Sequence, residues 1–213
     1  MTSPLVLGVL VSGSGTNLQA VIDAVASGRL RATIGVVLSN VATAKGLDRA
    51  RAAGIPTVAL DHKAHASREA FDGAVVEVLR AHGVSCVVLA GFMRIITATL
   101  LDAFPQRVLN IHPSLLPAFP GVRAQAQALD YGVRISGCTV HLVDGGMDTG
   151  PILAQAAVPV LDGDTADTLR DRILVKEHEL LPEVLQWIAD GRVEVLADER
   201  GGRPRIRISD APR

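Results

Sequence analysis

The chain has little net charge, few cysteines and no long hydrophobic run. Its formal net charge of −1 gives no reason to expect nucleic acid or an acidic membrane surface as a partner. The two cysteines, Cys86 and Cys138, lie far apart in apolar surroundings, which favours buried thiols over a disulfide or a metal site. The apolar N-terminal stretch lacks a preceding basic region and is too short to span a membrane. We therefore expect a soluble, cytoplasmic protein.

Through the first half of the chain, apolar runs of strand length alternate with segments of helical period. This alternation predicts an α/β fold: a Rossmann-like, open, mostly parallel twisted sheet with helices on both faces and right-handed crossovers. The expected strands are Leu5–Val11, Thr33–Leu38, Thr57–Leu60, Cys86–Ala90 and Val108–Ile111. The expected helices are Leu18–Ala26, Ala42–Ala53 and the segment that Ser67 caps and Gly83 ends.

The second half of the chain has a different character. Two β-like runs bracket the glycine-rich segment "DGGMDTG", which indicates antiparallel or mixed pairing at one side of the sheet. A long amphipathic helix is expected to kink or break at Pro182. The expected elements are a short helix at Ala124–Leu129, strands at Ile135–Val143 and Pro151–Val160, the long helix at Thr165–Ala189, and a terminal hairpin around Gly201-Gly202. No repeat or linker interrupts the chain, so a single domain over 1–213 is predicted, with halves at about 1–105 and 106–213.

A glycine loop, "SGSGTNLQA" at Ser12–Ala20, follows the first strand and opens the first helix. This is the position of an anion site, where backbone N–H groups and the positive end of the helix dipole face a ligand. A dinucleotide fingerprint would need a third glycine where Leu18 stands and an acidic residue in place of Ser39-Asn40. The two glycines alone are equally typical of a tight turn, but Thr16 and Asn17 can donate or cap and favour a phosphate monoester.

The segment "LNIHPSLLP" places Asn110 and His112 where a buried strand ends. Side chains at i and i+2 of a strand share one face, so the two should point to the same side. An amide can donate to an oxyanion, and a protonated imidazole can also deliver its proton. Asp148, in "GGMDTGP", is a carboxylate that would raise the pKa of His112 and keep the imidazole charged near neutral pH. A hydrogen-bonded structural histidine is the alternative.

Other catalytic chemistries find little support in the sequence. Ser114 lies between two prolines without a flanking glycine, which does not favour a nucleophile elbow. The remaining histidines show no pair at metal-ligand spacing on a helix, so no metal is expected; they are His62, His65, His82, His141 and His178. Direct transfer to an amine acceptor, without a covalent intermediate, fits the polar trio best.

Six segments in order and at matching intervals resemble the phosphoribosylglycinamide formyltransferase family, a group of folate-dependent enzymes of purine synthesis. The resemblance covers the chain from about Leu5 to Gly191, and Pro113 after the histidine favours this group over the related deformylases and methionyl-tRNA enzymes. The segments are "SGSGTNLQA", "SREAFD", "LAGFMRI", "LNIHPSLLPAFPG", "GCTVHLVDGGMDTGPILAQ" and "KEHELLP".

The resemblance implies a formyltransferase fold and formyl transfer from 10-formyltetrahydrofolate, as a co-substrate, to glycinamide ribonucleotide. It implies catalytic roles for Asn110, His112 and Asp148, with His112 as the proton donor and Asn110 also touching the formyl group. The residues implied to bind the ribonucleotide are Gly15, Thr16, Asn17 and Glu177. The residues implied to line the folate site are Arg68, Met93, Arg94, Ile95 and Ile96.

One position departs from the family pattern, because Arg123 stands where a histidine is usual. This histidine is not one of the trio, so activity should survive while the charge or hydrogen bonding near Asp148 changes. Two rivals to the transferase remain: a hydrolase that releases formate from the formyl folate, and a non-catalytic phosphoribosyl- or folate-binding module. Mere binding would not need Asp148. A homodimer is left open.

Overall fold

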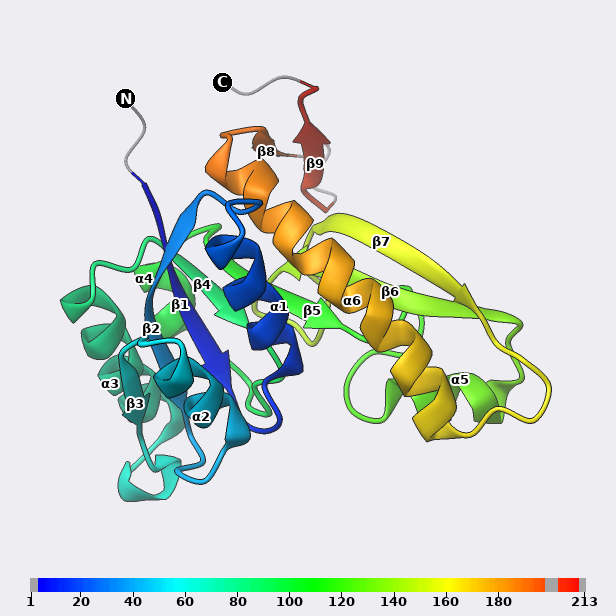
Figure 1. Cartoon of the computed structure of the whole chain (residues 1–213), viewed down its shortest axis with the longest axis horizontal. Coiled ribbons are helices and arrows are strands. Elements are labelled where there is room, and N and C mark those ends of the chain that lie inside the picture. Colours follow the sequence, from blue (N-terminus) through cyan, green and yellow to red (C-terminus); the bar gives the residue numbers. More distant parts are fainter. Residues whose placement is uncertain (1–3, 198–202, 211–213) are drawn as a thin grey trace.

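A seven-stranded sheet organises the fold, and the computed structural model describes residues 4–197 and 203–210 (Figure 1). The strand order is β3-β2-β1-β4-β5-β6-β7. Strands β1 to β5 run parallel, whereas β6 pairs antiparallel with β5 and β7 pairs antiparallel with β6. The predicted α/β class with a mixed C-terminal part is confirmed. The strands are β1 (Leu5–Val11), β2 (Ala32–Ser39), β3 (Thr57–Ala59), β4 (Cys86–Leu89), β5 (Val108–His112), β6 (Ile135–Leu142) and β7 (Ile152–Pro159).

Helices cover both faces of this sheet, and each face has its own core. Leu7 and Val9 of β1 lie in the core shared with α1, α2 and α6, whereas Leu10 lies in the core shared with α3 and α4. Successive side chains of a strand point to opposite faces, so a strand covered on both faces needs the continuous apolar run that β1 has. The helices are α1 (Thr16–Ala26), α2 (Lys45–Ala52), α3 (Arg68–Ala81), α4 (Ala98–Ala103), α5 (Ala124–Tyr131) and α6 (Ala166–Ala189), with a 3₁₀ turn η1 at His62–Ala64.

Two helices differ from the sequence-based expectation. The six-residue α4 was not predicted, since it is too short to show helical periodicity. It begins after Thr97, whose N–H and hydroxyl both donate to Asp72 of α3 at 2.7 Å, a contact that only the tertiary structure supplies. Helix α6 runs through Pro182 without a break, so the predicted break is wrong. Packing of the helix against β6, β7 and α1 outweighs the loss of one backbone hydrogen bond.

The terminal hairpin and the thiols agree with expectation. Strands β8 (Val193–Leu196) and β9 (Arg205–Ile208) pair antiparallel, and the predicted turn at Gly201-Gly202 lies outside the described residues. Cys86 and Cys138 are buried free thiols. None of the described helices combines the length and apolar character needed to cross a membrane.

The strand order reverses at β1, which lies between β2 and β4. The chain moves outward from β1 to β3 and then returns to continue on the other side with β4 and β5 (Figure 1). The loops after β1 and β4 therefore leave the sheet in opposite directions. Ligands of open α/β sheets bind at such a switch point, beyond the carboxyl ends of the strands.

Candidate active site

The loops at the switch point are tied together by Ser12, the residue after β1. Its hydroxyl donates to Asn40 Oδ1 at 2.6 Å and accepts the backbone N–H of Met93 at 2.9 Å. Asn40 follows β2 and Met93 follows β4, so one side chain joins the carboxyl ends of three strands. The loops that follow these three strands are therefore held together.

The glycine loop has the geometry of an anion site. Gly15, the N-cap of α1, has a φ of 68°, in the left-handed region that favours glycine. A Cβ at this position would lie 2.5 Å from the Cα of Gly46 on α2, so a side chain is excluded by packing as well. The first turn of α1 carries no acidic residue and no side-chain cap. Its backbone N–H groups are therefore available to an anion.

Glu177, far along the chain on α6, lies beside this loop. Asn17 Nδ2 donates to Glu177 Oε2 at 2.8 Å, so two predicted binding residues separated by 160 positions come together. Glu177 is only 6% exposed, and burial raises the pKa of its carboxyl while the hydrogen bond from Asn17 opposes this rise. Asn17 Oδ1 is buried without a hydrogen-bond partner among the described residues. A ligand that binds at this loop could donate a hydrogen bond to this oxygen.

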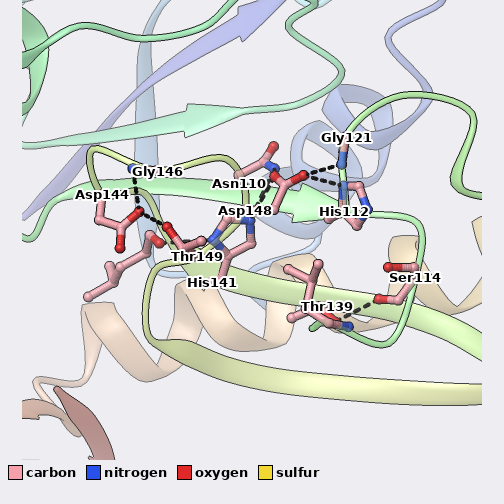
Figure 2. A network of polar contacts seen from close by, with 12 residues as sticks. Asn110, His112, Ser114, Gly121, Thr139, His141, Asp144, Gly146, Asp148 and Thr149 are labelled. Carbon is pink, nitrogen blue, oxygen red and sulfur yellow. Dashed lines mark hydrogen bonds and ion pairs between the residues drawn. The ribbon is translucent and has the colours of Figure 1, made fainter. Parts of the chain in front are cut away.

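His112, at the end of β5, is 4% exposed and lies beside Asp148 (Figure 2). Both of its ring nitrogens are near oxygen atoms. Nε2 lies 2.9 Å from the carbonyl oxygen of Phe119, which can only accept, so Nε2 carries a hydrogen. Nδ1 lies 3.4 Å from Asp148 Oδ2. Protonation of Nδ1 would therefore create an ion pair with Asp148.

Asp148 is held at the centre of the polar cluster. The N–H of Gly121 donates to its Oδ2 at 2.7 Å, and Asn110 Nδ2 lies 3.4 Å from its Oδ1. The His141 side chain, the Gly121 N–H and His112 together lower the pKa of Asp148 to about 2, although burial opposes them. The carboxylate is therefore charged at neutral pH.

The predicted net rise in the pKa of His112 is wrong. Burial lowers the pKa of His112, and it outweighs the opposing effects of the Phe119 carbonyl and of Asp148. Asp148 does act in the predicted direction, since a nearby carboxylate favours the charged imidazole. Charging the buried imidazole costs more hydration free energy than the attraction of this one carboxylate provides.

His141 was missed as a member of the site. It is paired directly with Asn110 in the β5–β6 register, just as Thr139 is paired with His112. Cross-strand partners share one face, so the polar alternation of "CTVHLV" opposite "LNIH" was the signal that could have revealed it. His141 Nε2 lies 3.1 Å from Asn110 Nδ2 and 3.6 Å from Asp148 Oδ1 (Figure 2).

The residues predicted to line a folate site lie on the loop after β4 and the first turn of α3. Met93 and Ile95 are exposed, at 73% and 59%, whereas Ile96 is buried. The guanidinium of Arg94 lies 4.9 Å from the centre of the Phe71 ring, and Phe71 is one helical turn after Arg68. The two segments therefore lie side by side, with apolar side chains open to a ligand.

Arg123, which stands where a histidine is usual in the resembling family, does not contact Asp148 through its side chain. Arg123 is exposed and has a φ of 60° just before α5. Asp148 is bound by the backbone of Gly121, two residues earlier, and that contact does not depend on the side chain at 123.

Two alternative chemistries can be compared with the structure. The hydroxyl of Ser114 is buried and donates to the carbonyl oxygen of Ala118, and the absence of a nucleophile role stays a prediction. Within residues 4–197 and 203–210, no group of three or more His, Cys, Asp or Glu is placed to hold a metal ion. The absence of a metal stays a prediction.

Comparison with known proteins gives a consistent result. The formyl transferase family model matches residues 6–185. Phosphoribosylglycinamide formyltransferase of Escherichia coli (strain K12) is 45% identical over 187 residues, which cover 88% of this chain and 88% of that protein. A crystal structure of glycinamide ribonucleotide transformylase 1 from Symbiobacterium toebii is 53% identical with a TM-score of 0.92, covering 97% of this chain and 95% of that one.

Longer relatives match as well. The trifunctional purine biosynthetic protein adenosine-3 of Bos taurus is 47% identical over 189 residues, or 89% of this chain. These residues make up 19% of the bovine protein, so the chain spans about a fifth of the length of such relatives.

Proposed function

The chain belongs to the formyl transferase family, and from this membership we propose that it transfers a formyl group from 10-formyltetrahydrofolate to the amine of N1-(5-phospho-D-ribosyl)glycinamide. The products are the N-formyl ribonucleotide and tetrahydrofolate, and the step belongs to de novo purine synthesis. The observation that carries this proposal is the contact of Asn110, His112 and Asp148 with one another at the carboxyl end of β5. The glycine loop follows β1 at the same edge of the parallel sheet.

The ribonucleotide binds at the start of α1. Its phosphate accepts hydrogen bonds from the uncapped N–H groups after Gly15, including those of Thr16 and Asn17, and is favoured by the helix dipole. The sugar hydroxyls reach Glu177, whose carboxyl already accepts from Asn17 and retains acceptor capacity. This arrangement directs the amine end of the substrate toward β5.

The formyl folate binds on the other side of the trio. Its flat, apolar ring system packs on the exposed residues of the loop after β4, with Arg94 and Arg68 beside it to meet acidic groups of the co-substrate. The loop that contains Asp148 forms the opposite boundary, and the formyl carbon lies between the two substrates. A folate bound in this way would cover Met93, Ile95 and Ile96.

The chemistry is a direct substitution at the formyl carbon. The amine nitrogen forms a bond to this carbon, and negative charge grows on the formyl oxygen, where Asn110 donates a hydrogen bond. The C–N bond to the folate then breaks, and the folate nitrogen gains a proton from His112, while the proton that the attacking nitrogen loses passes to the imidazole and restores its charged form. Asp148 stabilises the imidazolium form of His112 through the 3.4 Å contact.

His112 can donate a proton to the substrate only after one of its ring nitrogens gives up its present contact. Its Nε2 hydrogen is bound to the Phe119 carbonyl, and its Nδ1 faces Asp148. Substrate binding must therefore exchange one of these contacts for the reacting group. Because burial alone favours the neutral ring, the negative charge that develops on the formyl oxygen supplies the additional stabilisation of the imidazolium.

A formate assay separates this proposal from its rivals. The protein is incubated with 10-formyltetrahydrofolate, first alone and then with the ribonucleotide, while loss of the donor and release of formate are followed. Donor loss that requires the amine supports the transferase. Formate release without the amine identifies a hydrolase, and binding of both ligands without turnover identifies a binding module. A cytoplasmic location and action without a metal, nucleic acid or membrane stay predictions, and a homodimer stays open.

A further inference from the structure

We propose that Thr139 is a positioning residue that anchors the loop after His112, so that the Phe119 carbonyl oxygen keeps the imidazole Nε2 hydrogen and Nδ1 is the nitrogen that exchanges the proton. This inference rests on the proposed formyl transfer. It follows from the hydrogen bonds that Thr139 and Gln155 make to residues 113–118.

The loop after β5 makes the two backbone contacts on which the pair of His112 and Asp148 depends. The chain leaves the strand at His112 and returns seven residues later, where the Phe119 carbonyl oxygen lies 2.9 Å from Nε2. The Gly121 N–H then donates to Asp148 Oδ2 at 2.7 Å. The path of residues 113–118 therefore sets where this carbonyl and this N–H lie relative to the ring and the carboxylate.

Thr139 fixes the middle of this loop through its hydroxyl. It is buried on β6, directly opposite His112 in the register with β5. Its Oγ1 donates to the Ser114 carbonyl oxygen at 2.7 Å (Figure 2). The same oxygen accepts the Leu116 N–H and a hydrogen of Gln155 Nε2, each at 3.0 Å. A hydroxyl offers one hydrogen and two lone pairs, so these three bonds use its full capacity.

Gln155 on β7 completes the network. Its Nε2 also donates to the Leu116 carbonyl oxygen at 2.9 Å, so both backbone groups of Leu116 are bound to side chains of the neighbouring strands. The Ser114 hydroxyl donates to the carbonyl oxygen of Ala118, the residue before Phe119. Backbone N–H groups only donate and backbone carbonyls only accept, so the direction of each bond is fixed. The loop is therefore anchored to β6 and β7 at any protonation state of the nearby histidines.

This anchoring decides which nitrogen of His112 can change partner. The Nε2 contact at 2.9 Å ends on a loop held by several hydrogen bonds, whereas Nδ1 faces Asp148 at the longer distance of 3.4 Å. The reacting group therefore comes to Nδ1, and the Phe119 carbonyl keeps the ring in its orientation while the proton moves. Without the Thr139 hydroxyl, the loop loses its central anchor and the carbonyl can move away from Nε2.

Thr139→Val deletes the hydroxyl and keeps the branched shape of the side chain. We expect kcat to fall by about 10- to 100-fold, since a misplacement of about 1 Å can cost roughly 10²-fold in rate. KM for the ribonucleotide should stay nearly constant, because its phosphate binds at α1. In nitrogen-15 NMR spectra, the hydrogen on His112 Nε2 should exchange with solvent slowly in the parent protein and faster in the variant, because its acceptor has moved.

Three further variants control this experiment. Thr139→Ser should retain parental kcat and slow exchange, because serine carries the same hydroxyl. Ser136→Ala should change neither quantity; Ser136 is buried on the same strand, and its hydroxyl has no hydrogen-bond partner among the described residues. Gln155→Met removes both amide contacts from an exposed residue and should change both quantities in the same direction by a smaller amount, so it provides the test if Thr139→Val does not fold.

The outcomes separate positioning from stability. A folded Thr139→Val protein with parental kcat would overturn the proposal, as would a fall in kcat with unchanged exchange of the Nε2 hydrogen, because the hydroxyl would then serve stability alone. If only Gln155→Met folds, parental kcat or parental exchange in that variant overturns it equally. A parent protein that shows the slow exchange, and loses it in Thr139→Val, but transfers no formyl group would instead refute the proposed function and leave the positioning of His112 intact.

Discussion

Replacing Asp148 with asparagine should strongly impair turnover and shift the titration of His112. The substitution keeps size and hydrogen-bonding capacity but removes the charge that lies 3.4 Å from His112 Nδ1. Both side chains are largely buried, at 5% and 14% exposure for His112 and Asp148, so solvent screens the pair only in part. The charge is therefore the main quantity that changes.

The distance sets the size of the effect. At 3.4 Å and an effective dielectric constant of about 20, the attraction between the imidazolium and the carboxylate is about 5 kcal/mol. Each 1.4 kcal/mol corresponds to about a tenfold change in rate, so the ceiling is a loss of about 3,000-fold in kcat. Since the new amide can still accept from Gly121, we expect a loss of about 10²–10³-fold at neutral pH.

The sign of the pH effect follows from which species the carboxylate stabilises. Asp148 favours the charged imidazole, so its removal must lower the pKa of His112 further than burial already does. The pH profile of kcat and the NMR titration of His112 should both move to lower pH in Asp148→Asn. Asp144→Asn is the matched control, because Asp144 lies in the same loop but accepts from Gly146 and Thr149. Identical titration of His112 in the parent and in Asp148→Asn would refute the pair.

Three further predictions concern other parts of the molecule. Asn110→Ala should lower kcat by about 10²–10³-fold without loss of thermal stability, and near-normal turnover would show that the amide only caps β5. Asn17→Ala removes the hydrogen bond to Glu177, so KM for the ribonucleotide should rise while folate affinity, measured by calorimetry, stays constant; equal weakening of both ligands would contradict the assigned sites. Burial raises the pKa of Cys86 and Cys138 to about 12, so neither thiol should react with a thiol reagent at pH 8 until denaturant is added, and rapid labelling of the folded protein would refute this.

The glycine loop shows why one obvious variant is a poor probe. Gly15→Val would remove the close approach to an anion, but a Cβ at this position also meets the Cα of Gly46 at 2.5 Å. The variant would disturb the contact between α1 and α2 whether or not a phosphate binds. Asn17→Ala avoids this problem, because Asn17 already carries a Cβ and the change only removes polar atoms.

The sequence is sufficient to predict the sheet, because a strand that is buried on both faces has a long apolar run, such as Leu5–Val11. It also identifies Asn110 and His112, since polar residues that end such a strand stand out. Helix α4 could not be predicted, because Asp72 holds its start from another helix. His141 was also missed, because it lies in an apolar strand and becomes significant only when β5 and β6 are paired.

The electrostatics of the site could be predicted only in part. Charge proximity gives the direction in which Asp148 acts on His112, but not the cost of burying the imidazole. That cost depends on Phe119 and the loop that covers the ring, which the sequence does not place. The net pKa is therefore a property of the folded site, not of the motif.

Transfer of a labelled formyl group tests the central claim most directly. The parent protein is incubated with the ribonucleotide and 10-formyltetrahydrofolate that carries carbon-13 in the formyl group, and both products are followed by mass spectrometry. We predict that the label moves to the ribonucleotide, with one N-formyl product for each tetrahydrofolate formed, and that Asp148→Asn slows both equally. Label that appears as formate, or a ribonucleotide that stays unlabelled while the parent protein is folded and binds both ligands, would contradict the assignment of Asn110, His112 and Asp148 to formyl transfer.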